Sequence, residues 1–436
     1  MMGRFTAVGL HVESAAAILP ARPCQRQHAA PFDGLTRRPG APYDGAAEGI
    51  TLGVVAKVGI VGGGPAGAAC AEALARQPGT EVTLFEAREG HEKPCGGGIP
   101  SAALREFPAL SDGSLARRVV RRLILISPSG REARLEAPGG IHVFRRSELD
   151  AFLRDRAERA GAKIARARVT RVSPADRAGW RVDAEGAPAA AFDHLVGADG
   201  VNGIVRRAFE PATLDREMTL ALFAYLPGGG PDEMVLKFLD RGRGYMWVFP
   251  RLDHVSVGIC ALRGALTRAR MEEDLESFIH GRFGAHAPAR VRGYFIPSTL
   301  RPPVDTRGRS VALIGDAGGF VDPLTREGIA HAMRSGLSAA EGLLRHGTLR
   351  TPALPGEMAF AHRYQHAFYR TGFTETMTRL AARSIALRRV LADLVCGDQS
   401  YSKLKRRLLW NAIPCGLEAG WRLTTSRRIY LGSPAQ

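Results

Sequence analysis

The sequence predicts an α/β protein with three parts: a parallel sheet built from three separate segments, an inserted and mostly antiparallel sheet domain, and a helical C-terminal region. Strand–turn–helix patterns occur at 54–87, 191–209 and 309–336. Runs rich in β-branched and aromatic residues lie between them, at 117–137 and 217–263. We therefore expect a first domain over 54–100, 142–210 and 290–350, a second over 101–141 and 211–289, and helices over 351–436.

Composition is that of a globular chain long enough for two domains, with 436 residues, 45% of them hydrophobic and 24% charged. The net charge of +17 comes almost wholly from arginine, since only six residues are lysine. Codon composition explains such an excess better than a functional basic surface does. No recognition motif accompanies the charge, so we expect no nucleic-acid partner. Residues 351–436 nevertheless hold 13 Lys or Arg against 5 Asp or Glu.

The N-terminal 53 residues are expected to be a disordered extension rather than a signal peptide, because Glu13 precedes their short apolar stretch and a proline interrupts it. Six cysteines are scattered without CxxC spacing, which argues against a disulfide framework and against a metal site. No apolar run reaches the roughly 18 residues of a spanning helix. These features favour a cytoplasmic protein.

The segment VVAKVGIVGGGPAGAACAEALARQPGTEVTLFEA reads as a strand, a tight glycine turn, a helix and a second strand. Gly62, Gly64 and Gly67 form GxGxxG, in which the glycines allow the turn, the approach of a pyrophosphate, and close packing of helix on strand. Glu86 ends the second strand, where an acid accepts hydrogen bonds from a ribose. We expect a Rossmann-like dinucleotide site here that also includes Ala66 and Arg88.

Two later segments extend this site. AFDHLVGADGVNGIVRRAF runs from a strand into Asp199 and Gly200, followed by a short helix. RSVALIGDAGGFVDPLTREGIAHAMRSG runs from a strand into Gly315 and Asp316, where the acid can accept a hydrogen bond from a sugar-alcohol hydroxyl. A helix is predicted to begin near Thr325, and its first amides would face the cofactor. Gly328 and Ile329 are placed in the cofactor site for this reason.

Together these segments resemble the FAD-dependent enzymes of the p-hydroxybenzoate hydroxylase type, in which three distant motifs fold onto one FAD. The resemblance covers residues 56 to 345 and implies FAD as the cofactor. It also implies an FAD contact from Arg146, which stands four residues before Asp150 in FRRSELD. Gly203 departs from the pattern, because the family usually has serine there.

Two further stretches select among the chemistries of that superfamily. KPCGGGIP, residues 93–100, and GYMWVFPR, residues 244–251, resemble the Cys-Gly-Gly and YxWxFP elements of the geranylgeranyl reductase family. The GGxxDPLTREGI turn resembles the same family, although Arg326 stands where many members have glycine. The resemblance implies that the loop containing Cys95, Gly97 and Gly98 passes close to the flavin.

Alternation along a strand places Tyr245, Trp247 and Phe249 on one face, which suits a long apolar chain. The same pattern also describes a sheet face packed into the core. We assign substrate contacts to these three residues and Pro250, and catalytic roles to Cys95, Tyr245 and Trp247. Cys95 is either a proton donor or a small residue that lines the pocket, and Tyr245 is the alternative acid.

Lys93 is expected to be a solvated loop lysine, with pairing to a phosphate or carboxylate of the substrate as the alternative. The predicted function is FAD-dependent reduction of carbon–carbon double bonds in an isoprenoid chain, free or carried by a lipid or pigment. A flavin monooxygenase or halogenase acting on an aromatic substrate is the first alternative. The electron donor, either NAD(P)H or ferredoxin, stays open, and the sequence gives no signal for an oligomeric state.

The second alternative is a flavin-binding protein at a membrane surface without turnover of its own. SKLKRRLLWNAIPCGLEAGWRL places Lys403, Lys405, Arg406 and Arg407 beside Leu408, Leu409 and Trp410. Basic and aromatic residues in this mixture suit an anionic lipid interface. An ordinary charged helix has the same composition. Peripheral contact with the inner membrane face is also compatible with a reductase that fetches a lipid substrate.

Overall fold

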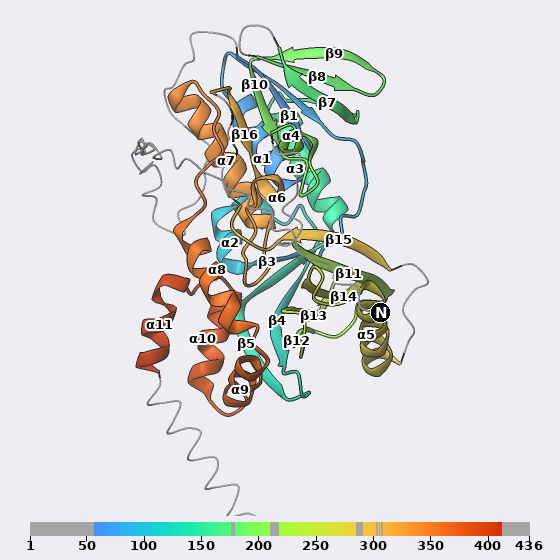
Figure 1. Cartoon of the computed structure of the whole chain (residues 1–436), viewed down its shortest axis with the longest axis vertical. Helices are drawn as coiled ribbons and strands as arrows, with labels where there is room; N and C mark the ends of the chain where they lie inside the picture. The colour runs from blue at the N-terminus through green and yellow to red at the C-terminus, as the bar shows by residue number, and fades with distance from the viewer. Residues whose placement is uncertain are drawn as a thin grey trace, which may run out of the picture. The chain divides into compact units, whose positions relative to one another are not determined.

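The computed structural model describes residues 56–175, 179–209, 218–284, 291–301, 304, 306 and 308–411 (Figure 1). The predicted N-terminal extension lies outside the described residues, as does the end of the predicted C-terminal region from 412 onward.

A five-stranded parallel sheet has the order β16-β10-β1-β2-β6. Its strands are β1 (Ala56–Val61), β2 (Thr80–Phe85), β6 (Lys163–Ala165), β10 (His194–Gly197) and β16 (Val311–Leu313). They come from all three segments that the sequence assigns to the parallel domain. Val58, Ile60, Val196 and Ala312 are fully buried, as expected for a sheet covered on both faces.

Three helices pack with this sheet: α1 (Pro65–Ala75), α3 (Arg146–Arg159) and α7 (Ile329–His346). Small residues allow α1 and α7 to approach closely, since a Cβ added at Gly336 would stand 2.3 Å from the Ala66 carbonyl oxygen. The α7 helix begins at Ile329, so the predicted start near Thr325 is wrong. The chain from Asp322 to Glu327 is instead a tight turn, closed by a 2.8 Å hydrogen bond from the Asp322 N–H to the Glu327 carbonyl.

A second sheet has eight strands in the order β15-β11-β14-β13-β12-β4-β5-β3. The strands are β3 (Gly98–Pro100), β4 (Arg117–Ile126), β5 (Glu132–Phe144), β11 (Met218–Pro227), β12 (Glu233–Phe238), β13 (Tyr245–Pro250), β14 (His254–Leu262) and β15 (Arg292–Pro297). Neighbouring strands run antiparallel except for the parallel pair β12 and β4, which confirms the mostly antiparallel sheet. The pairings give β15 to this sheet, although the predicted boundary at 290 places it with the other domain.

The two faces of β13 differ in what they contact. Met246 and Val248 belong to a core with α5 (Arg268–Phe283), while Tyr245, Trp247 and Phe249 lie on the other face. The predicted alternation along this strand is therefore confirmed. A small three-stranded antiparallel sheet, β7 (Val169–Pro174), β8 (Trp180–Ala184) and β9 (Ala187–Phe192), packs beside the parallel sheet and was not foreseen.

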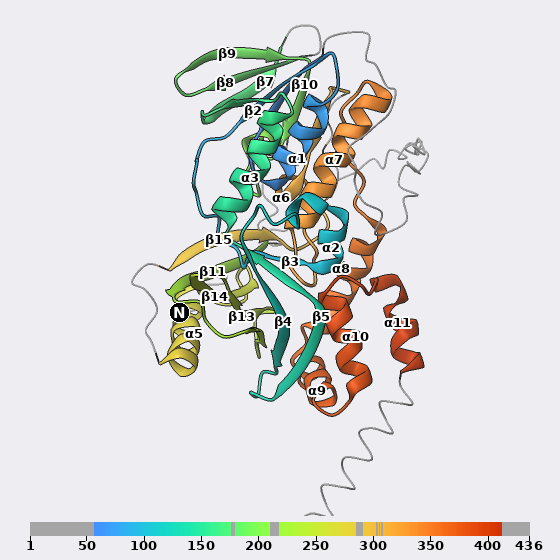
Figure 2. The ribbon, with the colours of Figure 1, turned by 180° about the vertical axis from the view of Figure 1, so that it is seen from behind.

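The C-terminal part of the described chain is helical, as predicted: α8 (Gly356–Phe368), α9 (Thr371–Ala381), α10 (Ile385–Val395) and α11 (Tyr401–Trp410). Figure 2 shows α9 and α10 beside β5, and Met377, Ala381 and Leu391 join the core of that sheet. Short elements complete the chain: α2 (Ser101–Glu106), η1 (Pro108–Leu110), α4 (Ile204–Arg207) and α6 (Gly315–Gly318).

Candidate active site

The glycine turn between β1 and α1 forms a cradle in which each glycine has a distinct role. Gly62 has φ +106°, and a Cβ there would lie 2.4 Å from the Ala198 carbonyl oxygen. A Cβ at Gly67 would stand 2.0 Å from the Gly62 carbonyl oxygen, so this residue permits close packing of helix on strand. Gly64, the N-cap of α1, has no atom within 4 Å of its Cβ position and faces open space. Ala66 is buried in the first turn of α1.

Glu86 follows β2, and its carboxylate accepts hydrogen bonds from the Gly63 N–H (2.9 Å) and the Arg88 N–H (2.8 Å). The acid therefore lies next to the glycine turn, as a ribose-binding residue should. The Arg88 side chain is exposed at the rim of this site.

Asp199 follows β10 and is partly buried, and one of its carboxylate oxygens, Oδ2, accepts from the Val205 N–H at 3.0 Å. Among the described residues the other oxygen, Oδ1, has no partner. Burial raises the pKa of Asp199 to about 6. A Cβ at Gly203 would stand 2.1 Å from Oδ1, which explains why glycine occupies this position. Gly200 has φ +83° and approaches the Tyr294 hydroxyl.

The β16 turn brings Asp316 next to the loop that precedes Cys95. Lys93 Nζ lies 2.8 Å from Asp316 Oδ2 and 4.8 Å from the centroid of the Tyr294 ring. Burial favours the neutral amine, but the Asp316 carboxylate outweighs it and raises the pKa of Lys93. The expectation of a solvated loop lysine is therefore wrong. Gly315, with φ +58°, packs on Ala66, while Gly328 is the N-cap of α7 and Ile329 is buried behind it.

The three glycines after Cys95 each meet a specific neighbour. Gly97 has φ +81°, and a Cβ there would lie 2.2 Å from the Phe144 carbonyl oxygen. A Cβ at Gly98 would stand 2.6 Å from the Phe249 ring, and one at Gly96 would stand 3.1 Å from it. The glycine run thus lets the Cys95 loop lie directly against the aromatic face of β13.

A buried arginine joins the two sequence stretches that selected the chemistry. Arg251 is 1% exposed and follows Pro250, the last residue of β13. Its Nη2 donates to the Cys95 carbonyl oxygen at 2.9 Å, and its Nη1 donates to Glu92. Ser256 adds a 3.4 Å hydrogen bond to the same Cys95 oxygen.

Glu92 ties this arginine to the start of α3. The Glu92 carboxylate accepts hydrogen bonds from the N–H groups of Arg146 (3.0 Å) and Ser147 (2.8 Å). Burial alone would raise the pKa of Glu92, but Arg251 and the Ser147 N–H outweigh it and lower the pKa to about 2. The Arg146 side chain is also buried and binds Asp150 in a bidentate pair at 2.9–3.1 Å. Its predicted cofactor contact remains a proposal.

The aromatic face of β13 is dense and largely apolar. Trp247 is 7% exposed, and its Nε1 donates to Ser256 Oγ at 3.3 Å. Tyr245 stacks on Tyr369 with ring centroids 6.5 Å apart and an interplanar angle of 13°. Phe249 continues the face to the Cys95 loop, so one wall runs from Tyr245 to Cys95.

Comparisons with known proteins identify the family of the chain. The family model for a NAD(P)-binding Rossmann-like domain matches residues 60–109. The chain is 34% identical over 323 residues to the chloroplastic geranylgeranyl diphosphate reductase of Oryza sativa subsp. japonica, covering 66% of each chain. It is 30% identical over 383 residues to the geranylgeranyl diphosphate reductase of Synechocystis sp., covering 80% of this chain and 91% of the relative. The chain belongs to the geranylgeranyl reductase family.

Solved structures show the same fold. The geranylgeranyl bacteriochlorophyll reductase-like protein of Thermoplasma acidophilum superposes with a TM-score of 0.65 at 21% identity, over 81% of this chain and 98% of that one. The halogenase PltM superposes with a TM-score of 0.57 at 14% identity, over 84% of this chain and 85% of that one. At such identities the likeness concerns the fold.

As a geranylgeranyl reductase family member, the protein is an oxidoreductase with FAD as its cofactor. The residues present fit that group: open space at Gly64 before α1, an acid at the end of β2, and the unpaired buried oxygen of Asp199. In such a site the cradle of Gly62, Gly64 and Gly67 would hold the dinucleotide, and the Asp316 turn would hold its ribityl chain.

The sequence did not reveal the Glu92–Arg251 pair in this family member. Glu92 directly precedes KPCGGGIP, and Arg251 is the last residue of GYMWVFPR, so each lies at the end of a stretch that was singled out. The opposite charges of these two residues, each at the end of such a stretch, were the only available indication of an ion pair. Nothing local indicated that residues 159 positions apart would meet.

Proposed function

We propose that this protein reduces carbon–carbon double bonds of an isoprenoid chain, as the names of its relatives suggest. The observation that carries the proposal is the aromatic wall of Tyr245, Trp247 and Phe249 that ends on the Cys95 loop. A long apolar chain lying along this wall is shielded from water and directed toward Cys95. When bound and reduced, FAD supplies the hydride for one alkene carbon.

The second alkene carbon needs a proton, and Cys95 is the better of the two candidates. Among the cysteines of the described chain, Cys70, Cys260 and Cys396 are buried, whereas Cys95 is partly exposed. Its Sγ accepts from the Gly97 N–H at 3.2 Å, which leaves the thiol proton free to point elsewhere. The Tyr245 hydroxyl already donates to the Thr325 carbonyl at 3.0 Å, and burial raises the pKa of Tyr245 well above its usual value.

An anaerobic single-turnover experiment tests this proposal without a physiological electron donor. Photoreduced holoenzyme is mixed with geranylgeranyl diphosphate or geranylgeraniol, and the flavin absorbance is followed. We expect the flavin to reoxidise and the product to gain two hydrogens for each bond reduced. A flavin that stays reduced with every prenyl substrate, while admission of oxygen and chloride yields a chlorinated or hydroxylated aromatic product, would instead point to halogenation or hydroxylation.

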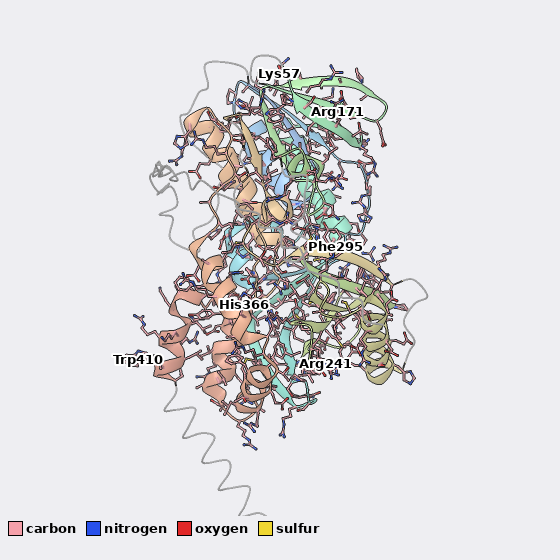
Figure 3. All side chains as sticks on the ribbon, in the orientation of Figure 1. Lys57, Arg171, Arg241, Phe295, His366 and Trp410 are labelled. Atoms are coloured by element: carbon pink, nitrogen blue, oxygen red, sulfur yellow. The ribbon has the colours of Figure 1, made fainter. Side chains whose placement is uncertain are left out.

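We also propose peripheral contact of α11 with an anionic lipid surface. Trp410 at the end of this helix is labelled in Figure 3 and is 78% exposed. Leu409 is 65% exposed, and Lys403, Lys405 and Arg406 on the same helix are exposed as well. Exposed apolar and basic groups together favour an interfacial helix. No helix in the described part of the chain is long and apolar enough to cross a membrane.

Arg407 differs from its basic neighbours, because it pairs with Asp393 at 2.6 Å. Liposome flotation with and without phosphatidylserine compares wild type with the K403Q/K405Q/R406Q variant. A matched control, K57Q/K163Q/R171Q, removes three exposed positive charges from other elements. Equal flotation of both variants would contradict a specific role for α11.

A further inference from the structure

Arg326 adopts a backbone conformation that arginine rarely takes. Its φ is +63°, and Arg243 is the other non-glycine residue with positive φ in the described part of the chain. The left-handed region costs an L-residue roughly 1–2 kcal/mol, and glycine avoids this cost. Strain of this kind persists only where the surroundings impose it, and it is concentrated at functional sites.

The turn that contains Arg326 is held from several directions. Asp322 Oδ1 accepts hydrogen bonds from the N–H groups of Leu324 (2.7 Å) and Thr325 (2.9 Å). Tyrosine hydroxyls from three separate elements also donate to it: Tyr401 to Asp322 at 2.8 Å, Tyr369 to the Leu324 carbonyl at 2.5 Å, and Tyr245 to the Thr325 carbonyl at 3.0 Å. The turn is therefore fixed, and so is the strained position.

The Arg326 guanidinium is only partly satisfied by its neighbours. Its Nη1 donates to the carbonyl oxygens of Pro323 and Ser298 and to Gln365 Oε1, the last two at 3.5 and 3.4 Å. Its Nε is buried and lacks a hydrogen-bond partner within the described residues. No ion pair joins it to a carboxylate in that part of the chain, and both oxygens of Asp322 are taken by the donors named above.

This cation lies at the Tyr245 end of the aromatic wall. It stands 5.6 Å from the centroid of the Tyr369 ring, which stacks on Tyr245. Its charge also acts on the Tyr245 hydroxyl and on the Cys260 thiol behind it. At about 3.3 Å per residue along β13, Tyr245 and Phe249 are roughly 13 Å apart. An extended isoprenoid chain can therefore reach from one ring to the other.

We propose that Arg326 binds a phosphate oxygen at the polar end of the isoprenoid substrate. The inference rests on the proposed function and adds to it a residue that selects the headgroup. Guanidinium groups form strong, directed hydrogen bonds to phosphate, and Arg326 has an unused buried N–H. The nearby Asp322 carboxylate is already occupied by other donors and forms no ion pair with it among the described residues. The phosphate belongs either to a prenyl diphosphate or to a phospholipid with prenyl chains, and the two share this chemistry.

Paired substrates test the assignment. Geranylgeranyl diphosphate is compared with geranylgeraniol, and a digeranylgeranylglycerophospholipid with its phosphate-free glycerol ether. In R326Q, which keeps the backbone cost and removes the charge, we expect kcat/KM to fall at least tenfold for the phosphorylated member of one pair. For the phosphate-free member of the same pair, kcat/KM should change less than threefold. The pair that responds identifies the source, and R326K should recover part of the preference.

Two controls separate the outcomes. R243G relieves the same kind of strain at an exposed site. For each substrate pair, it should leave the ratio of kcat/KM for the phosphorylated member to kcat/KM for the phosphate-free member unchanged. R326G and R326Q holoenzymes are also compared with wild type for binding of inorganic diphosphate by calorimetry, a readout that needs no turnover. If wild type reduces no prenyl substrate, the proposed function fails, while weaker diphosphate binding by R326Q would still support Arg326. Unchanged substrate ratios and unchanged diphosphate affinity in R326Q would overturn the inference.

Discussion

Replacing Arg251 with methionine should lower the free energy of unfolding, because Arg251 holds the Cys95 loop in place. Methionine has a similar volume but donates no hydrogen bonds, so the variant loses the 2.9 Å bond to the Cys95 carbonyl and the pair with Glu92. The Glu92 carboxylate keeps its bonds to the N–H groups of Arg146 and Ser147, but it is left as a largely buried charge, 17% exposed, without the Arg251 cation. Removing one partner of a buried ion pair typically costs about 3–5 kcal/mol.

The lowered pKa of Glu92 gives an independent magnitude. A shift from 4.5 to about 2 corresponds to roughly 3 kcal/mol of folding free energy at pH 7, at about 1.4 kcal/mol per pH unit. Because the folded-state pKa lies below the unfolded value, this contribution is complete above the unfolded pKa and is lost as pH falls toward the folded one. About 1.4 kcal/mol of it should be lost between pH 7 and pH 3.5 in wild type. In R251M the part of this pKa shift that Arg251 causes is absent, so acidification should cause less of that loss.

Urea unfolding of the holoenzyme, followed by tryptophan fluorescence at pH 7 and pH 3.5, measures both effects. We expect R251M to lose about 3 kcal/mol at pH 7 and the gap to wild type to narrow by about 1–2 kcal/mol at pH 3.5. R145M is the matched control, since Arg145 is partly exposed and its pairs with Glu148 and Asp253 should contribute at most about 1 kcal/mol. An R251M variant that resembles R145M, or a loss that does not depend on pH, would refute the reasoning.

Three further predictions concern the same loop and wall. Gly97→Ala should lower the unfolding free energy by about 2–4 kcal/mol, because the added Cβ meets the Phe144 carbonyl. Gly90→Ala should lower it by only about 1–2 kcal/mol, because the added Cβ there meets no atom. Thermal melting compares the two variants. Cys95→Ala should slow flavin reoxidation by a prenyl substrate at least tenfold while FAD absorbance is retained, and an unchanged rate would reduce Cys95 to a lining residue. Tyr245→Phe should leave the pH–rate profile unchanged and lower stability by about 1 kcal/mol, measured by stopped-flow and urea unfolding, because its hydroxyl bonds the Thr325 carbonyl; a shifted profile would make Tyr245 the acid.

The sequence predicted those parts of the fold and site that depend on local geometry. GxGxxG requires a positive φ at Gly62 and close packing at Gly67, and strand alternation places Tyr245 and Trp247 on one face. The start of α7 was misplaced because a fixed turn competes with the helix signal, and its bonds come from tyrosines far along the chain. Lys93 was misjudged because its partner Asp316 lies 223 residues away.

The glycine run after Cys95 and the aromatic strand are mutually required. Any side chain at Gly98 would enter the volume of the Phe249 ring, and the Arg251 that follows the strand fixes the carbonyl of Cys95 itself. The position of the thiol is therefore set by the same strand that forms the substrate wall, through both van der Waals contact and a hydrogen bond. Because one rigid element determines both positions, a change that moves the wall also moves the thiol. For this reason, substitutions along β13 should alter the rate of reduction as well as substrate affinity.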